Sequence, residues 1–328
     1  MIKVQTSEGK IFNKDQAVIQ IIKHITQGKS TIQINLNGEG PCCQSNGIYN
    51  LLDNICDTFA YPKHQVEIHT ANFLESHAEY CIIRQHQNYE LVAAMQSVPR
   101  AAKSTKIFNN DFYHFGHFIG HGNKQRLQLG SYLWSNHRDI TLQSYHCDVL
   151  DPYHREFIGL EDLMHDASLS QQQIEWAFDL LSNAPLKLEP GVRYPIGPDQ
   201  TFNIIDCYPK FFVELVSLTF TSGNTFYIDE KIWRPILMRT PFMVQGPSGL
   251  IPNLRRLGFR TFDSWWDEGY SEDPNDCHVP GMIQNIKRLA EFGTQDLESM
   301  YQDMNDVLDH NFQRLLDLKA NDFTKVFS

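Results

Sequence analysis

Positive charge is scarce in this sequence: 28 lysines and arginines stand against 39 acidic residues among 328, which gives a net charge of −11. Nucleic acids and anionic membrane surfaces attract proteins through a positive field, so this balance disfavours broad binding to either. A local basic site for an anionic ligand is compatible with it, because a few placed residues can hold such a ligand. We therefore expect no nucleic acid among the partners of the protein.

Cysteine pairs and long apolar runs are also missing. None of the seven cysteines belongs to a Cys-x-x-Cys pair, and the neighbours Cys42 and Cys43 are poor disulfide partners for each other. No apolar run approaches the ~18 residues that a membrane-spanning helix needs. The first residues, MIKVQTSEGKIF, lack the apolar centre of a signal peptide. The pattern predicts a cytoplasmic protein with reduced thiols and no membrane span.

Hydrophobic patterning indicates an α/β protein. Residues 31–36 have the composition of a strand and run into a glycine-rich loop, and SNGIYNLLDNICDTFA then repeats apolar residues at helical spacing. HQVEIHTANF alternates like a second strand. This β-α-β unit implies a parallel sheet with functional loops at the carboxyl ends of its strands.

A second set of units follows a polar, turn-like stretch at 100–111. A strand, a helix and a strand are predicted in FYHFGHFIG, NKQRLQLGSYLWSN and ITLQSYH, and a buried strand in FFVELVSLTF. Apolar positions between Leu297 and Leu315 mark one long amphipathic helix that packs back on the body. We expect two Rossmann-like parallel-sheet domains that face a cleft, at 1–105 and 106–280, and C-terminal helices at 281–328.

The stretch TFYIDEKIWRPILMRTPFMVQG, residues 225–246, holds the strongest candidate site. It begins and ends with β-type runs, and Glu230 and Lys231 lie where the first run gives way to an amphipathic helix. The free N–H groups and positive dipole end of such a helix bind phosphate. A lysine there adds charge-assisted hydrogen bonds to a diphosphate, and a carboxylate can accept from ribose hydroxyls. The alternative is an exposed capping acid beside a solvated lysine.

A second strand–loop–helix junction supports the first interpretation. Arg126 lies early in the helix after FGHFIGHGN, a loop with glycines of its own. Two junctions of this kind in one domain can hold a nucleotide diphosphate from two sides.

These two motifs carry a resemblance. FYIDEKIWRPILMRTPFMVQGP resembles the donor-site motif of the α1,3-fucosyltransferases, and FIGHGNKQRLQLGSYL is similar to the loop and Arg-bearing helix of that family. EGPCCQSNGIYNLLD, FGHFIGHGN and GFRTFDSWWDEGY resemble stretches of phage- and virus-encoded glycosyltransferase-like proteins, a likeness that spans most of the chain. Both resemblances imply the two-domain fold called GT-B, with a nucleotide sugar bound mainly by the C-terminal half. They imply a hexosyl- or fucosyltransferase-like enzyme, located in the host cytoplasm if a phage or virus encodes it.

The same resemblance implies roles for individual residues. Glu230 would meet the ribose, while Lys231 and Arg126 would meet the diphosphate and take part in catalysis. Asp229 stands where the family has threonine, and the loop has His-Gly-Asn in place of Ser-Asn, so the nucleotide and the sugar stay open. The rest of the expected donor site comprises Gly120, His121, Gly122, Asn123, Tyr227, Asp229, Arg234 and Gly246.

Metal chemistry is not expected. The sequence has no Asp-x-Asp, the metal–diphosphate motif of the other major transferase fold. Cationic side chains and helix ends can neutralise a leaving diphosphate instead, so we expect no cofactor besides the nucleotide sugar as co-substrate. His114, His117 and His121 are close in sequence, but the first two face opposite sides of a strand, which argues against a shared metal.

The general base of an inverting reaction belongs in the N-terminal loops, within reach of the acceptor hydroxyl. Glu39 in NGEGP and Glu75 in TANFLESH are the candidates, with His69 and His77 as weaker ones. Glu39 is preferred because its flanking glycines let backbone approach a ligand closely.

The sequence thus favours a transferase that moves a sugar from a nucleotide sugar to a glycan or another hydroxyl acceptor. Three alternatives stay open: a catalytically inactive nucleotide- or glycan-binding module, a glycosyltransferase that acts on modified DNA bases, and a metal hydrolase built on the histidines. Trp265 and Trp266 are candidates to stack on sugar or base, although burial of at least one against the sheet is the favoured role.

Overall fold

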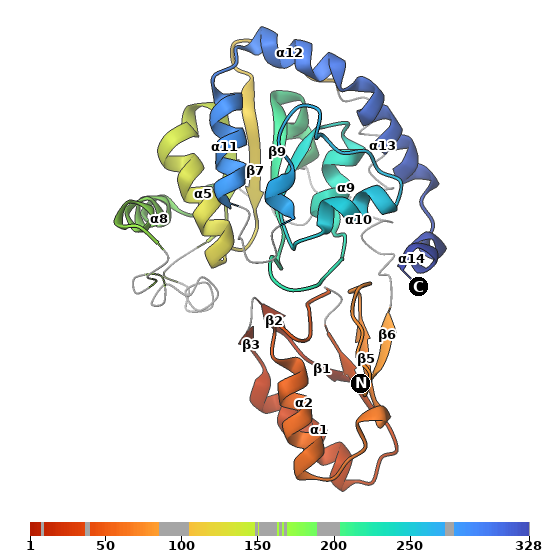
Figure 1. Ribbon diagram of the computed structural model, residues 1–328. Helices are drawn as coiled ribbons and strands as arrows, with labels where there is room; N and C mark the ends of the chain where they lie inside the picture. The colour runs from red at the N-terminus through yellow and green to blue at the C-terminus, as the bar shows by residue number, and fades with distance from the viewer. Residues whose placement is uncertain are drawn as a thin grey trace.

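The computed structural model describes residues 1–7, 10–36, 40–84, 105–147, 150, 163, 166, 169–188, 204–272 and 279–327. These residues form two parallel sheets, each with its own helices, and a group of C-terminal helices (Figure 1). The expected architecture of two parallel-sheet α/β domains followed by helices is therefore confirmed, while the boundaries at 105 and 280 stay predictions. Within the same residues, no helix has the length and apolar character needed to cross a membrane.

The first sheet has the strand order β1-β4-β5-β6, and all of its pairs are parallel. Ile32 and Ile34 are buried and flank the exposed Gln33, which is the two-residue period of a strand with one buried face. The predicted β-α-β unit is confirmed as β4, α2 and β5. The elements of this region are β1 (Ile2–Lys3), the hairpin of β2 (Thr6–Ser7) and β3 (Lys10–Ile11), α1 (Lys14–Thr26), β4 (Ile32–Asn35), α2 (Ile48–Thr58), η1 (Lys63–Gln65), β5 (Val66–Thr70) and β6 (Cys81–Arg84).

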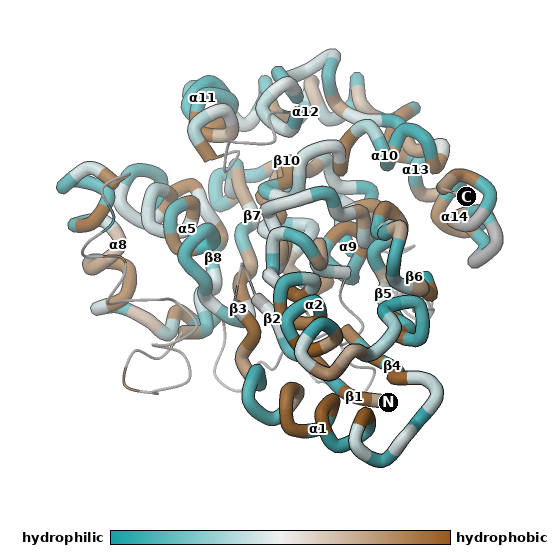
Figure 2. Tube along the Cα trace, turned by 60° about the horizontal axis from the view of Figure 1, so that its bottom comes forward, coloured by the Kyte–Doolittle hydropathy of each residue, from teal (hydrophilic) through white to brown (hydrophobic). Residues whose placement is uncertain are grey.

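The second sheet has the order β10-β9-β7-β8 and is also parallel throughout. Its central strand β9 is buried along its whole length, as expected of a parallel sheet covered on both faces. Helix α8 lies beside α5 on one flank of this sheet (Figures 1 and 2). The elements are β7 (Tyr113–Ile119), α5 (Lys124–His137), η2 (Arg138–Ile140), β8 (Thr141–Tyr145), α8 (Gln171–Asn183), η3 (Ile204–Lys210), β9 (Phe211–Ser217), α9 (Glu230–Leu237), β10 (Phe242–Gln245), α10 (Leu250–Arg256) and η4 (Gly269–Ser271).

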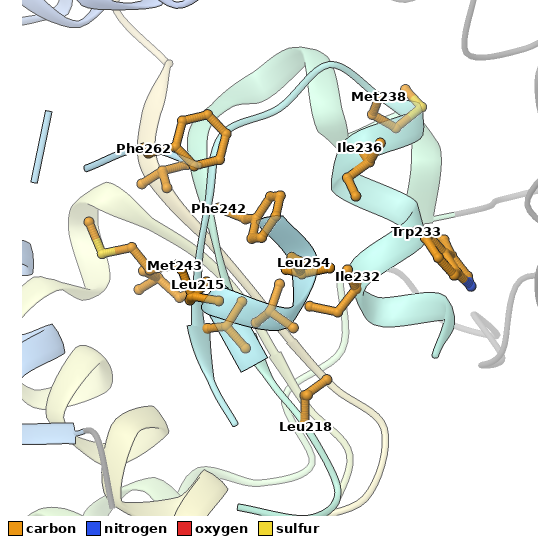
Figure 3. Close-up of a cluster of buried hydrophobic side chains, with 14 of the residues drawn as sticks. Leu215, Leu218, Ile232, Trp233, Ile236, Met238, Phe242, Met243, Leu254 and Phe262 are labelled. Carbon is orange, nitrogen blue, oxygen red and sulfur yellow. The ribbon is translucent and has the colours of Figure 1, made fainter. Parts of the chain in front are cut away.

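The apolar face of α9 fixes this helix against the second sheet. Ile232 points toward Leu254 of α10, and Ile236 lies on the same side of the helix (Figure 3). Both isoleucines are buried, and Phe242 of β10 belongs to the same cluster. Burial of one such side chain contributes about 1.5–3 kcal/mol, so the position of the amino end of α9 is set by packing.

The start of the 225–246 stretch corrects one prediction. No strand forms at 225–228, although Phe226 and Ile228 are buried. The backbone of Phe226 bonds to the N-terminal domain instead: its N–H donates to Asn72 Oδ1 over 2.9 Å, and its carbonyl accepts from Phe73 N over 3.1 Å. The β-type composition here reflects burial between the domains and not membership of a sheet.

The C-terminal segment corrects a second prediction. The amphipathic pattern from Leu297 to Leu315 is real, but it belongs to two helices that meet at Met304 and not to one long helix. Gly293 is the N-cap of the first of these helices, and its N–H donates to Asp296 Oδ2 over 2.9 Å. This cap separates the first of the two helices from the helix that precedes it. The helices are α11 (Val279–Ala290), α12 (Thr294–Asp303), α13 (Asn305–Asp317) and α14 (Ala320–Phe327).

Helix α14 reaches the N-terminal domain. The ring of Phe323 stacks on Phe73 with a centroid distance of 5.0 Å, and Arg84 of β6 donates to the carbonyl of Phe327 over 3.3 Å. Figure 1 shows this last helix beside the junction of the two domains. The expected packing of the C-terminal helices back on the body is thus observed.

Candidate functional site

The amino end of α9 is built from three charged residues in a row. Asp229 is the N-cap, in extended backbone with φ −102° and ψ −176°, and its Oδ1 accepts from the N–H of Lys231 over 3.0 Å. Lys231 Nζ lies 2.6 Å from Asp229 Oδ2 and 3.0 Å from Glu230 Oε1. The lysine side chain keeps 18% exposure. We call Asp229, Glu230 and Lys231 the α9 triad.

The two carboxyls of the α9 triad differ in proton affinity. Burial raises the pKa of Asp229, and this effect outweighs the attraction of Lys231. Burial acts in the same direction on Glu230, but the charges of Lys231 and Arg234 outweigh it and hold the pKa of Glu230 below its ordinary value. Glu230 is therefore ionised at neutral pH and is an acceptor for hydroxyl donors.

A small pocket adjoins the α9 triad, between the two domains. Three segments of the C-terminal domain form its walls: one follows β9, one precedes α9 and one follows β10. The N-terminal domain contributes Gly40. The volume is about 20 Å³, which is room for about one water. It lies at the carboxyl ends of β9 and β10, where open parallel sheets bind ligands. The lining residues are Gly40, Leu218, Thr219, Phe220, Thr225, Tyr227, Asp229 and Pro247.

Arg126 supports one wall of this pocket. Its guanidinium is buried and donates to three oxygens: Leu218 O over 3.2 Å, His121 O over 2.8 Å and Thr219 Oγ1 over 3.0 Å. The charge of Arg126 also lowers the pKa of Asp229, against the effect of burial. The loop and first turn at the start of α5, residues 120–126, which we call the α5 junction, therefore share one electrostatic environment with the α9 triad. The structure therefore brings together the two motifs that the sequence singled out, with Arg126 directed into the loop after β9.

The rest of the α5 junction is held by capping and close packing. Asn123 is the N-cap of α5, and its Oδ1 accepts from Arg126 N over 2.8 Å. Gly122 packs against Tyr145, whose Oη would lie only 2.5 Å from a Cβ at this position. A Cβ at Gly246 would lie 3.0 Å from Leu218 Cδ1. Packing alone thus requires glycine at 122, while Gly120 is half-buried and His121 is exposed in the same loop.

Arg234 lies elsewhere. It is buried and forms an ion pair with Glu214 of β9, and its Nε lies 2.6 Å from Tyr208 Oη. None of these atoms belongs to a residue that lines the pocket. The structure therefore gives Arg234 an internal partner and keeps its guanidinium away from the pocket.

The candidates for the general base are placed unequally. Glu39 lies in 37–39, outside the described residues, and is followed in sequence by Gly40 of the pocket wall. Glu75 is buried, and its two oxygens accept from Tyr49 Oη over 2.7 Å, from Cys43 N over 2.8 Å and from Asn72 Nδ2 over 3.3 Å. Glu75 therefore has its acceptor capacity largely used in holding the N-terminal loops.

The weaker histidine candidates also have structural contacts. His69 Nε2 lies 3.4 Å from Glu67 Oε2, and the ring of His77 lies 4.3 Å from that of Tyr49. Neither residue belongs to the pocket wall.

The histidines of β7 are separate from one another. His114 Nε2 lies 2.8 Å from Phe292 O. His117 packs against Ser217 and Gln143, and burial, together with the charge of Arg126, lowers its pKa to about 3. Within the part of the chain that the structure describes, no group of three His, Cys, Asp or Glu side chains is arranged to hold a metal ion.

The tryptophan pair of the GFRTFDSWWDEGY stretch belongs to the core. Trp266 is buried with its ring 5.2 Å from Phe262, and Trp265 packs at the edge of the same cluster. Cys42 and Cys43 are also buried. None of these residues lines the inter-domain pocket.

Sequence reasoning missed Thr219, Phe220 and Thr225 of the pocket wall and missed Asn72, which ties the domains together. Asn72 is buried, and its Nδ2 donates to Asn224 O over 3.0 Å while its Oδ1 accepts from Phe226 N. The end of the FFVELVSLTF strand would have indicated Thr219, because ligands meet parallel sheets at that end. Asn72 gives no such indication, because its partners in the other domain lie more than 150 residues away in sequence.

Comparison with known proteins gives little. No protein-family model and no curated protein matches the sequence. Among solved structures, the chain is similar to a UDP-forming α,α-trehalose-phosphate synthase from Burkholderia xenovorans, with 9% sequence identity and a TM-score of 0.41. The similarity covers 95% of this chain and 72% of that one.

Proposed function

We propose that the protein is a glycosyltransferase of the GT-B type, which moves a sugar from a nucleoside diphosphate sugar to a glycan or another hydroxyl acceptor. The observation that carries the proposal is the α9 triad beside a pocket that both domains line. A helix amino end, a reachable lysine and an ionised glutamate lie there in consecutive positions. The resemblance to the fucosyltransferase donor motif falls on these same residues.

The triad suggests how a diphosphate would be received. Lys231 is neutralised by Asp229 and Glu230, so an entering diphosphate competes with two carboxylates for its ammonium group. A diphosphate carries more charge than either carboxylate and can also accept from the N–H groups at the start of α9. Negative charge on the leaving diphosphate grows as the glycosidic bond breaks, so a lysine at this place stabilises the transition state more than the ground state.

The other residues take supporting roles in this proposal. Glu230 accepts hydrogen bonds from the ribose hydroxyls because its pKa is held low. Arg126 fixes Leu218 and Thr219 and adds positive potential without a direct contact in the state described. Lys231 and Arg126 together make a metal unnecessary for charge neutralisation, so we propose a metal-independent reaction.

The small size of the pocket limits what it would hold. A bound nucleotide sugar needs several hundred Å³, whereas this pocket has a volume of about 20 Å³. We place the diphosphate of the donor at the rim of this pocket, at the amino end of α9, where Lys231 is partly exposed. For the general base we favour Glu39, since it precedes Gly40 of the pocket wall, whereas Glu75 already accepts three hydrogen bonds.

A ligand screen tests the proposal. Melting temperatures of the wild-type protein are measured with UDP, GDP, ADP and CDP and with their common sugar derivatives. A ligand that binds only the folded state at about 100 times its Kd adds about 2.7 kcal/mol of stability. Hits are then tested for release of the nucleoside diphosphate with a mixture of oligosaccharide acceptors, with and without EDTA. We expect one nucleotide to stabilise the protein and turnover to survive EDTA.

Lys231→Ala gives the residue-level test, with Lys287→Ala on the exposed side of α11 as the matched control. Loss of one preorganised charge donor lowers kcat by about 10²–10³, so this variant should lose that much activity while the control keeps it. Binding without turnover for any acceptor would favour an inactive binding module. The absence of a shift with every nucleotide would contradict the proposal altogether.

A further inference from the structure

A second pocket lies on the outer flank of the C-terminal domain, between α5 and α8. Its volume is about 510 Å³, within the range of small-ligand sites. It is formed by the last turn of α5 with the residues that follow it, and by the middle of α8. Its lining residues include Trp134, Asn136, Arg138, Glu175, Trp176 and Asp179. We call it the α5–α8 pocket.

The two tryptophans are held in place from behind. Trp134 packs against the apolar cluster that contains Leu180 and Leu181, and its Nε1 donates to Asp179 Oδ2 over 3.0 Å. The ring of Trp176 meets Tyr132 edge to face, at a centroid distance of 5.7 Å and an angle of 68°. Both tryptophans are half-buried. Each ring therefore has one supported side and an exposed part that contributes to the pocket.

The polar side chains around these rings form a mixed set of donors and acceptors. Arg138 supplies N–H donors, while Asp139, Glu175 and Asp179 supply carboxylate oxygens. Asn136 Nδ2 donates to Tyr132 O over 2.9 Å, and its amide oxygen is a further acceptor. Three carboxylates against one guanidinium disfavour an anionic ligand such as a nucleotide.

We propose that the α5–α8 pocket binds a neutral carbohydrate. Aromatic rings offer an apolar surface that the C–H groups of a sugar ring can cover. Carboxylates accept from sugar hydroxyls, and guanidinium or amide groups donate to them. An aromatic cage for an organic cation needs only rings and negative charge, and Arg138 works against such a ligand. The mixed donor and acceptor set thus favours a neutral polyhydroxylated ligand.

The α5–α8 pocket is distinct from the inter-domain pocket beside the α9 triad. Helix α5 begins at Lys124, near Arg126 and the loop after β9, and Trp134 lies in its last turn. With a rise of about 1.5 Å per residue, Trp134 is about 12 Å along the helix axis from Arg126, toward the other end of the sheet. A glycan held here would be bound apart from the site of transfer, as an anchor for a polymeric or surface-attached glycan.

Calorimetric titration of the full-length protein tests the proposal. The probes are neutral oligosaccharides of glucose, galactose, mannose and N-acetylglucosamine, and choline serves as the cationic probe. We expect at least one oligosaccharide to bind, with quenching of tryptophan fluorescence, and choline to fail. Trp176→Ala should weaken binding roughly tenfold or more through the loss of one stacking surface. Glu175→Gln, an exposed substitution that leaves packing intact, should weaken it roughly fivefold.

Phe178→Ala is the matched control, because Phe178 is a 37% exposed aromatic residue of α8 that does not line the pocket. It should bind the oligosaccharide like the wild type, and every variant should keep the response to nucleotides. The proposal is overturned if no oligosaccharide binds, or if binding is unchanged in both Trp176→Ala and Glu175→Gln. Binding of choline that depends on Trp176, without sugar binding, would also overturn it.

Discussion

Lys231 and Arg234 lie one turn apart on α9, yet their ion-pair partners and their burial differ. Lys231 contacts Asp229 and Glu230 at the rim of a pocket, and its side chain is 18% exposed. Arg234 is paired with Glu214 in the interior, where the two side chains are 5% and 1% exposed. An ion pair that water can reach can exchange partners at low cost, whereas a sealed pair cannot. Position on the helix, and not residue type, therefore separates a cation that water can reach from one that is sealed in the interior.

The interior pair belongs to a larger polar network. Tyr208 Oη donates to Glu214 and accepts from Arg234 Nε, and Lys106 Nζ lies 2.8 Å from the carbonyl of Tyr208 and 2.5 Å from that of Phe211. Burial raises the pKa of Glu214 despite the charge of Arg234, and it holds the pKa of Lys106 well below its usual range. The amine of Lys106 donates to these two carbonyls.

The largest expected effect breaks the interior pair. Arg234→Met leaves the carboxylate of Glu214 buried without its cation, which costs about 3–5 kcal/mol of the free energy of unfolding. Lys231→Met should cost less than this, because the side chains of Lys231 and Glu230 are 18% and 28% exposed and water can replace part of the lost contact. Urea unfolding of both variants measures the difference. Equal losses would show that the two ends of α9 are not as different as their burial indicates.

Glu214→Met combined with Arg234→Met serves as the control for this prediction. It removes both charges, so a large part of the lost stability should return. If the double variant is as unstable as Arg234→Met, the loss comes from packing and not from the unpaired carboxylate.

A smaller effect appears in the pH dependence of stability. Burial lowers the pKa of Lys106 in the folded protein relative to the unfolded chain, so the unfolded state binds more protons between the lowered pKa and about 10.4. Over that window the stability due to this group rises with pH, by about 1.4 kcal/mol per pH unit. Lys106→Met removes the effect. The stability of the wild type should therefore rise more steeply with pH below about pH 10 than that of the variant, and parallel curves would contradict a lowered pKa of Lys106.

The smallest effect concerns Glu230. Glu230→Gln keeps the shape and one acceptor oxygen, so it should mainly raise the KM of the donor, by about 1 kcal/mol in free-energy terms, with a smaller change in kcat. A 2′,3′-dideoxyribose donor should bind worse than the normal donor in the wild type, and this gap should shrink in the variant. An equal gap in both proteins would remove Glu230 from the ribose and leave it as a residue of the helix end.

The sequence allowed prediction of those parts that depend on local pattern. The β-α-β units, α5 and the amino end of α9 follow from hydrophobic period and from the residues at helix starts. The sequence also contains a sign that Arg234 has a partner in the interior. Glu214 interrupts the apolar run FFVELVS, and a buried glutamate needs a cation. The absence of a strand at 225–228 could not be predicted, because the hydrogen-bond partners of Phe226 come from the other domain.

The contact between α14 and the N-terminal domain bears on how the gene can be divided. A gene cut near codon 105 would yield an N-terminal piece in which Phe73 and Arg84 lose Phe323, Phe327 and the carbonyl that Arg84 binds. In the complementary piece Phe323 and Phe327 would lose the cover of Phe73, while Phe327 would keep its contacts with Phe226 and Arg256. The apolar surface uncovered on α14 invites aggregation. The two halves should therefore be produced together, or the first one joined through a linker to a copy of α14.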